Sequence, residues 1–116
     1  MAVELRPSQA LRLLHELSLA QVRDGAPDLS PRQLAILLSV YLEAPPHTVR
    51  GLAARLGVTK PVITRALDTM GQLGFVSRRR DEADRRNVII QRTVEGALYV
   101  ERFGDLVVAT ARALPR

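Results

Sequence analysis

Residues 48–93 constrain the fold of this chain more than any other stretch, because helix caps and turn residues follow one another there at short intervals. Thr48 is a suitable N-cap for a short helix, and Gly57 can adopt the left-handed backbone conformation that turns the chain. Thr59 then caps a second helix, which carries Pro61 in its first turn. This order of signals predicts two short helices joined by a tight turn.

The second helix has an apolar face and a polar face. Its apolar residues stand at i, i+3, i+4 and i+7, the spacing of a buried helical stripe, and are Ile63, Ala66, Leu67 and Met70. Its N-terminus and opposite face carry Thr59, Lys60, Pro61, Val62, Thr64, Arg65 and Asp68. We therefore expect this helix to be covered on one side only.

A β-hairpin is predicted to follow. Residues 75–79 and 87–92 have the composition of strands, and the polar segment 80–86 has that of a loop. Residues 48–92 therefore read as a helix-turn-helix plus wing. The predicted fold is mainly α with a small β-hairpin wing, a winged helix-turn-helix with flanking N- and C-terminal helices.

Residues 8–24 and 94–114 are the predicted flanking helices, with Ser8 and Thr93 as their N-caps. Both are apolar on more than one side, and such a helix needs cover on more than one side. We expect these two helices to pair with a partner subunit, and we expect residues 1–116 to form a single winged-helix domain.

A further helix is predicted from a capping box, Ser30 to Gln33, to about Glu43. The side chains expected in the core on this helix are Leu34, Leu37, Leu38, Tyr41 and Leu42.

The net charge of +5 is confined to one part of the sequence. Between Arg55 and Arg92 nine basic residues stand against four acidic ones, whereas the remainder carries eight of each sign. A basic region on the predicted helix-turn-helix and wing is typical of a protein that binds a polyanion such as double-stranded DNA. A solvated basic face is the alternative reading.

Other classes of function find little support. The chain has no cysteine, so a disulfide, a thiolate metal site and a thiol redox switch are excluded. His15 and His47 are far apart and lack clustered acidic neighbours, so we expect no metal site. We find no nucleophile–base pair and no phosphate loop, and therefore expect neither an enzyme nor a cofactor. With no secretory segment and no membrane span evident, we expect a cytoplasmic protein.

The outer face of the second helix suits the major groove of DNA. Thr59 and Lys60 stand at the helix N-terminus, which attracts phosphate. Arg65 can bond guanine O6 and N7, and Thr64 can meet a base edge. Val62 is equally compatible with a thymine methyl and with packing. An ion pair of Arg65 with Asp68 or Asp81 is the alternative for Arg65.

In the loop, Asp84 stands two residues before Arg86 and can hold its guanidinium. A held arginine loses less rotamer freedom on binding, and a narrow minor groove attracts arginine. Arg78 and Arg85 are further candidate DNA contacts. An ordinary solvated turn of mixed charge is the alternative.

Several of these segments together resemble the MarR family of bacterial regulators, over about Leu29 to Leu98. The matching motifs are Leu52–Thr59, Val62–Arg65, Gly74–Val76, Arg78–Arg79, Asp84–Asn87 and Thr93–Gly96. The resemblance implies a winged-helix homodimer that binds pseudo-palindromic operator DNA, usually as a repressor. It also implies that Asp84 orients Arg86 in the minor groove, and that the helix contacts fall on Lys60, Pro61, Thr64 and Arg65.

The chain departs from the family in two respects. Its flanking helices are short for the family, so the dimer geometry is open. Many family members bind small effectors, but this chain has only two Phe and two Tyr, and no effector pocket is evident. A protein-interaction or assembly module without sequence-specific DNA binding is the alternative function.

Overall fold

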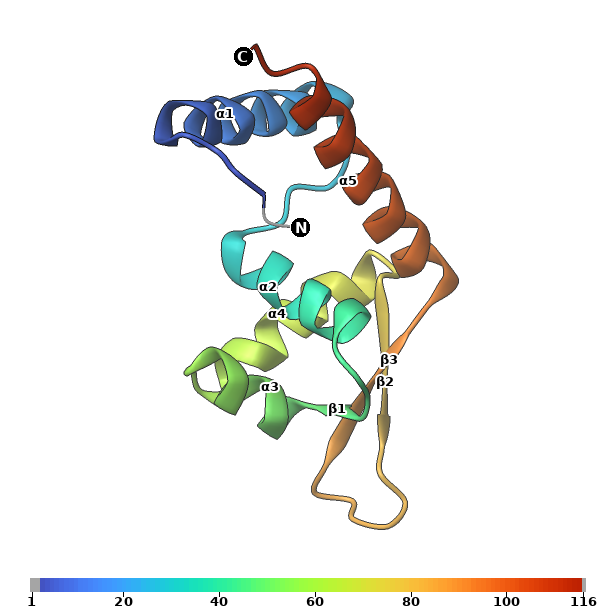
Figure 1. Cartoon of the computed structure of the whole chain (residues 1–116). Coiled ribbons are helices and arrows are strands. Elements are labelled where there is room, and N and C mark those ends of the chain that lie inside the picture. Colours follow the sequence, from blue (N-terminus) through green and yellow to red (C-terminus); the bar gives the residue numbers. More distant parts are fainter. Residues whose placement is uncertain (1–2, 116) are drawn as a thin grey trace. The chain divides into compact units, whose positions relative to one another are not determined.

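The computed structural model describes residues 3–115. In order, the elements are α1 (Pro7–Asp24), α2 (Pro31–Leu42), β1 (His47–Thr48), α3 (Val49–Leu56), α4 (Lys60–Gln72), β2 (Val76–Arg80), β3 (Val88–Arg92) and α5 (Val94–Arg112) (Figure 1). Leu29–Val100 form one compact unit, called here the winged-helix unit. The described residues before Leu29 and from Glu101 onward form a second unit. The predicted fold class is therefore confirmed.

Most of the predicted caps are present. At the start of α2, the Ser30 side chain accepts from the Gln33 N–H at 3.1 Å, and the Gln33 side chain accepts from the Ser30 N–H at 2.8 Å. Thr48 caps α3 by accepting from the Gly51 N–H at 2.9 Å. Gly57 ends α3 with φ +69°, as its left-handed role requires.

The predicted N-cap of α1 is wrong. Arg6 holds the N-cap position, and the helix begins at Pro7, so Ser8 lies inside its first turn. Proline suits the first helical position because its missing N–H would have no partner inside the helix. The Gln9 side chain accepts from the Arg6 N–H at 3.0 Å and completes the helix start.

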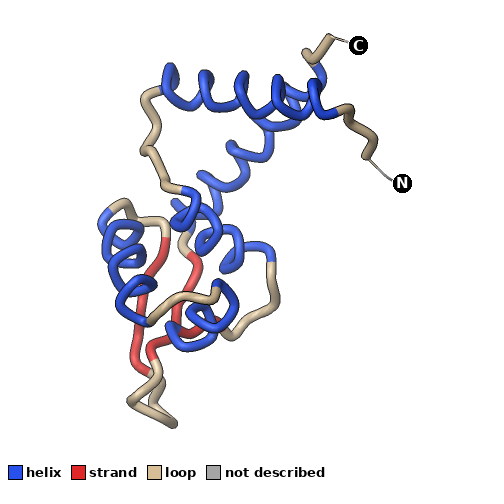
Figure 2. The backbone as a smooth tube through the Cα atoms, turned by 90° about the vertical axis from the view of Figure 1, so that its left-hand side faces the viewer, coloured by secondary structure: helices blue, strands red, loops and turns tan. Residues whose placement is uncertain are grey.

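The sheet has three antiparallel strands in the order β1-β3-β2, shown in red in Figure 2. β2 and β3 form the predicted hairpin, with Arg78 opposite Ile90. β1 was not predicted from the sequence, because its two residues are too few to show a strand pattern. Its Thr48 lies opposite Ile89, which joins the start of α3 to the loop end of β3.

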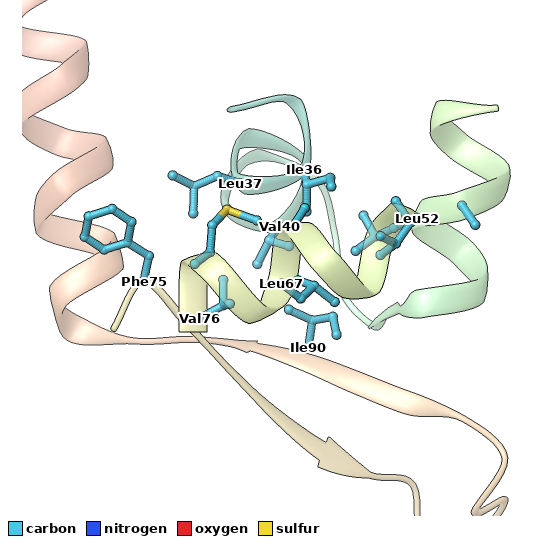
Figure 3. Packing of buried hydrophobic residues seen from close by; sticks show 12 residues of the cluster. Ile36, Leu37, Val40, Leu52, Leu67, Phe75, Val76 and Ile90 are labelled. Carbon is cyan, nitrogen blue, oxygen red and sulfur yellow. The ribbon is translucent and has the colours of Figure 1, made fainter. Parts of the chain in front are cut away.

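The core of the winged-helix unit gathers side chains from α2, α3, α4 and the sheet (Figure 3). Its buried members are Ile36, Leu37, Val40, Leu52, Ala53, Ile63, Ala66, Leu67, Met70, Phe75, Val76 and Ile90. All four apolar residues predicted for the inner face of α4 are among them. The prediction for α4 is confirmed, and this helix packs against α2, α3 and β2.

The prediction for α2 is only partly correct. Leu37 is buried, and Leu34, Leu38 and Tyr41 are partly buried, but Leu42 is 73% exposed. Ile36 and Val40, which were not predicted, are fully buried. The segment from Leu34 to Leu42 is apolar at nearly every position, so two helix faces fit the pattern equally well.

A hydrogen-bond network fixes both ends of the wing to the body of the winged-helix unit. The Tyr41 hydroxyl donates to the Phe75 carbonyl at 2.7 Å and accepts from the Thr93 N–H at 2.9 Å. The Thr93 hydroxyl donates to the Gly74 carbonyl at 2.6 Å and accepts from the Gly96 N–H at 2.9 Å, which caps α5 as predicted. The chain therefore enters and leaves the hairpin at one fixed point.

The second unit contains α1 and the C-terminal part of α5. No residue of α1 is buried, and Leu11, Leu14 and Val22 are exposed. The expected pairing of α1 with a partner subunit stays a prediction. Among the described residues, no helix is long and apolar enough to cross a membrane.

Gly96 of α5 lies where the hairpin joins this helix, and substitution there tests the packing, with Gly104 of the same helix as the control. A Cβ on Gly96 would overlap the Tyr41 hydroxyl and the Phe75 carbonyl, whereas a Cβ on Gly104 would meet nothing within 4 Å. We predict that Gly96→Ala lowers the free energy of unfolding by about 1–3 kcal/mol through overpacking. The matched variant Gly104→Ala should raise it by up to about 1 kcal/mol through helix propensity. Urea unfolding followed by circular dichroism measures both, and a Gly96→Ala variant as stable as the parent would contradict the packing described here.

Candidate nucleic-acid interface

The N-terminus and outer face of α4 are open to solvent. The exposed residues there are Thr59, Lys60, Pro61, Thr64 and Arg65, and Val62 is partly buried. The Thr59 side chain makes no capping hydrogen bond, although Thr59 occupies the N-cap position. The free amides of the first turn are thus not occupied by a side-chain cap and can donate hydrogen bonds to an anion.

Arg65 has no ion pair among the described residues. The alternative partner Asp68 instead binds Arg78, with 2.8 Å between Arg78 Nη2 and Asp68 Oδ1. The other alternative partner, Asp81, uses its side chain to accept from the Ala83 N–H at 2.9 Å. Arg65 is therefore exposed on the outer face of α4 with no ion pair among residues 3–115.

In the wing loop, Asp84 holds Arg86 by three hydrogen bonds. Arg86 Nε donates to Asp84 Oδ1 at 3.1 Å, and Arg86 Nη2 donates to Oδ2 at 3.3 Å. The Arg86 backbone N–H also donates to Oδ1, at 3.1 Å. The Arg86 side chain nevertheless remains 83% exposed. The guanidinium is thus fixed in direction while most of its surface stays available to a ligand.

The rest of the loop is also held by local bonds. The Asp81 N–H donates to the Asn87 carbonyl at 3.0 Å, and the Asn87 N–H donates to the Asp84 carbonyl at 2.9 Å. Arg80 Nη1 donates to the Arg85 carbonyl at 2.8 Å. Sequence reasoning did not assign this role to Arg80, because a side-chain bond to a backbone carbonyl leaves no pattern in the sequence. The wing tip is a structured loop and not a loose turn.

The hydrogen bonds from Arg86 hold the pKa of the Asp84 carboxyl below its ordinary value, first through the guanidinium and then through the backbone N–H. Desolvation by burial opposes this lowering of the pKa, and the positive charge of Arg50 adds a lesser contribution to it. Because the folded pKa is depressed, the Asp84–Arg86 pair is complete at neutral pH. Its contribution is lost only as the pH falls through that lowered pKa.

Arg50 is a candidate that the sequence did not single out. It lies in the first turn of α3, two residues after Thr48, which pairs with Ile89 of β3. This pairing brings the exposed Arg50 toward the loop end of the hairpin, where its charge reaches Asp84. Arg50 lies just before the basic region that runs from Arg55 to Arg92, and the β1–β3 pairing brings it near the wing loop.

The predicted candidates therefore fall into two groups within one compact unit. Those on α4 are Thr59, Lys60, Pro61, Val62, Thr64 and Arg65, and those on the wing are Arg78, Asp84, Arg85 and Arg86. Across residues 3–115 no group of three or more histidine or acidic side chains is placed to hold a metal ion.

The Asp84–Arg86 geometry predicts a titration that can be measured. We expect NMR to give a pKa for Asp84 below that of an ordinary aspartate, and we expect Arg86→Ala to raise it. Arg85→Ala removes a neighbouring charge without removing the hydrogen bonds, so it should raise the Asp84 pKa less. Equal effects of the two variants would show that general charge, and not the bonded pair, sets the Asp84 pKa.

The chain is similar to two curated regulators of Bacillus subtilis (strain 168). It is 39% identical to the HTH-type transcriptional repressor YetL over 77 residues, 65% of this chain and 46% of that protein. It is 36% identical to the organic hydroperoxide resistance transcriptional regulator over 76 residues, 66% of this chain and 50% of that protein. The chain thus spans about half the length of these curated relatives.

The fold has close counterparts among solved structures. A mutant of MarR from E. coli, complexed with operator DNA, matches with a TM-score of 0.67 at 27% identity and covers 90% of this chain and 69% of that one. The MarR family model matches residues 29–88, just over half of the chain and most of the winged-helix unit. The motifs, the fold and this match agree, and the chain belongs to the MarR family.

Proposed function

We propose that this protein is a sequence-specific, double-stranded DNA-binding transcriptional regulator that acts as a homodimer on a pseudo-palindromic operator. The observation that carries the proposal is the wing arginine Arg86, held on Asp84 yet mostly exposed, in the same compact unit as the open face of α4. The function is one of binding and not of enzymatic catalysis. Because the proposed ligand is chromosomal DNA, the proposed location is the bacterial cytoplasm.

In the proposed complex α4 is the recognition helix and lies in the major groove. Its N-terminus meets a phosphate through free amides and Lys60. Arg65 reaches a guanine edge, and Thr64 meets a neighbouring base. The exposure of these side chains and the absence of an ion pair at Arg65 among the described residues support this assignment.

The wing is proposed to place Arg86 in the adjacent minor groove. A narrow minor groove has an enhanced negative potential, which favours an inserted guanidinium. Since Asp84 already restricts the side chain of Arg86, less conformational entropy is lost when Arg86 binds. Arg85 and Arg50 are exposed near the same loop and are proposed to contact the flanking phosphates.

Repression is the proposed outcome of binding, since the relative YetL is named a repressor. A protein-interaction module is the competing function. Protein interfaces favour large apolar or aromatic anchors at their centre. The exposed face of α4 carries none, because its one apolar side chain beyond the proline, Val62, is partly buried. This composition favours DNA over a protein partner.

Two arginine variants test the proposal on one DNA site. Arg65→Ala should lower discrimination at one base pair of each half-site by about 1–3 kcal/mol. Arg86→Ala should weaken binding to all sequences and reduce the slope of log K against log salt by about 0.9 per subunit. Fluorescence anisotropy at several salt concentrations measures both effects.

Arg32→Ala is the matched control, because Arg32 is exposed on α2, outside α4 and the wing. It removes the same charge and should leave base preference unchanged. Equal affinity of the parent protein for its best site and for random DNA at physiological salt would refute the regulator proposal.

The proposal of a homodimer is based on the exposed apolar residues of α1. We predict that Leu14→Glu, which places a charge on an exposed apolar position of α1, shifts the protein from dimer toward monomer. Glu16→Ala, at a polar exposed position two residues away, should leave the dimer intact. Sedimentation velocity distinguishes the two states. A parent protein that sediments as a monomer at micromolar concentration would contradict the proposed dimer.

A further inference from the structure

The recognition helix and the wing are joined by one ion pair. Arg78 Nη2 of β2 lies 2.8 Å from Asp68 Oδ1 of α4. Both residues belong to the winged-helix unit, so the pair is a link within one compact body. Asp68 stands one helical turn after Thr64 and Arg65, on the face that we propose to enter the major groove.

The arginine of this pair is much less exposed than the arginine of the Asp84–Arg86 pair. The Arg78 side chain is 33% exposed, against 83% for Arg86. Its Nη2 atom lies 3.9 Å from the position that a Cβ on Gly71 would take, so the guanidinium rests against the last turn of α4. A guanidinium in this position is directed at α4.

Asp68 would otherwise be unfavourable at a DNA interface. Its side chain is 56% exposed, and an unpaired carboxylate there would repel the phosphates. With Arg78 beside it, the local charge is neutral. The Asp68 carboxylate thus has a structural role that offsets its repulsion of phosphate, because its ion pair links β2 to α4.

We propose that Asp68 and Arg78 are positioning residues that set the angle between the recognition helix and the wing, and that Arg78 does not contact DNA phosphate. This inference rests on the proposed DNA-binding function for its effect on affinity, but its geometry does not. It replaces the expectation from the sequence that Arg78 is itself a DNA contact.

The two roles of Arg78 predict opposite signs for an Asp68 variant. If Arg78 binds phosphate, removal of the Asp68 charge frees Arg78 and tightens DNA binding. If the pair sets the wing angle, Asp68→Ala weakens binding as Arg78→Ala does. Each single variant should then cost about three- to fivefold in affinity, as expected for an exposed pair. The double variant should cost no more than either single one.

The salt dependence gives a second readout. Under the proposal Arg78→Ala leaves the slope of log K against log salt unchanged, because no phosphate contact is lost. Arg79→Ala serves as the matched control for the removal of one charge from β2, since Arg79 is exposed and has no ion pair among residues 3–115. A slope reduced by about 0.9 in Arg78→Ala, with tighter binding by Asp68→Ala, would overturn the proposal.

A third readout needs no DNA. Residual dipolar couplings of backbone amides report the orientation of α4 relative to β2 and β3 in the free protein. We expect Asp68→Ala and Arg78→Ala to change this relative orientation, Arg79→Ala to preserve it, and the charge-reversed pair Asp68→Arg with Arg78→Asp to restore it. Unchanged couplings in both single variants would overturn the proposal. If the parent protein bound no specific DNA, the regulator function would fail while these couplings still decided the role of the pair.

Discussion

The burial of one face of α4 is the constraint on which the rest of the winged-helix unit depends. Ile63, Leu67 and Met70 are fully inaccessible to solvent, and Ala66 nearly so. A helix with four buried positions at this spacing cannot rotate about its axis without exposing apolar surface, at about 25 cal/mol for each Å². The packing of the core, and not their own contacts, therefore presents the exposed residues of the opposite face outward, namely Thr59, Lys60, Pro61, Thr64 and Arg65.

The wing depends on a different kind of interaction. Its strands are five residues each, too short to build a core beyond the contacts of Val76 and Ile90. The loop is instead ordered by hydrogen bonds. The carboxylates of Asp81 and Asp84 accept from neighbouring backbone N–H groups, and Arg80 donates to a backbone carbonyl. Such bonds are weak individually at the surface, but together they restrict a short loop. The same carboxylate, Asp84, serves both the loop backbone and the presentation of Arg86.

Much of this arrangement was predictable from the sequence. The four apolar residues of α4, the turn at Gly57 and the Asp84–Arg86 pair all involve residues within a few positions of one another, and local spacing predicts them. Where the sequence misled, the pattern was ambiguous or the contact was distant. The continuous apolar run of α2 fitted two faces, so Leu42 was expected inside in place of Ile36 and Val40. The Asp68–Arg78 pair, the reach of Arg50 and the strand β1 depend on tertiary pairing that no local pattern records.

In the proposed complex one compact unit reaches two adjacent grooves of a duplex, with α4 in the major groove and the wing in the minor groove. The chain has no cysteine, so a single reactive site can be introduced on either element. Iron-EDTA attached at Thr64→Cys or at Ala83→Cys would cleave the DNA nearest to each element. The proposed arrangement predicts two cleavage centres in each half-site, separated by roughly half of the helical turn of about 10.5 base pairs. Coincident centres, or cleavage spread evenly along the DNA from both positions, would contradict it.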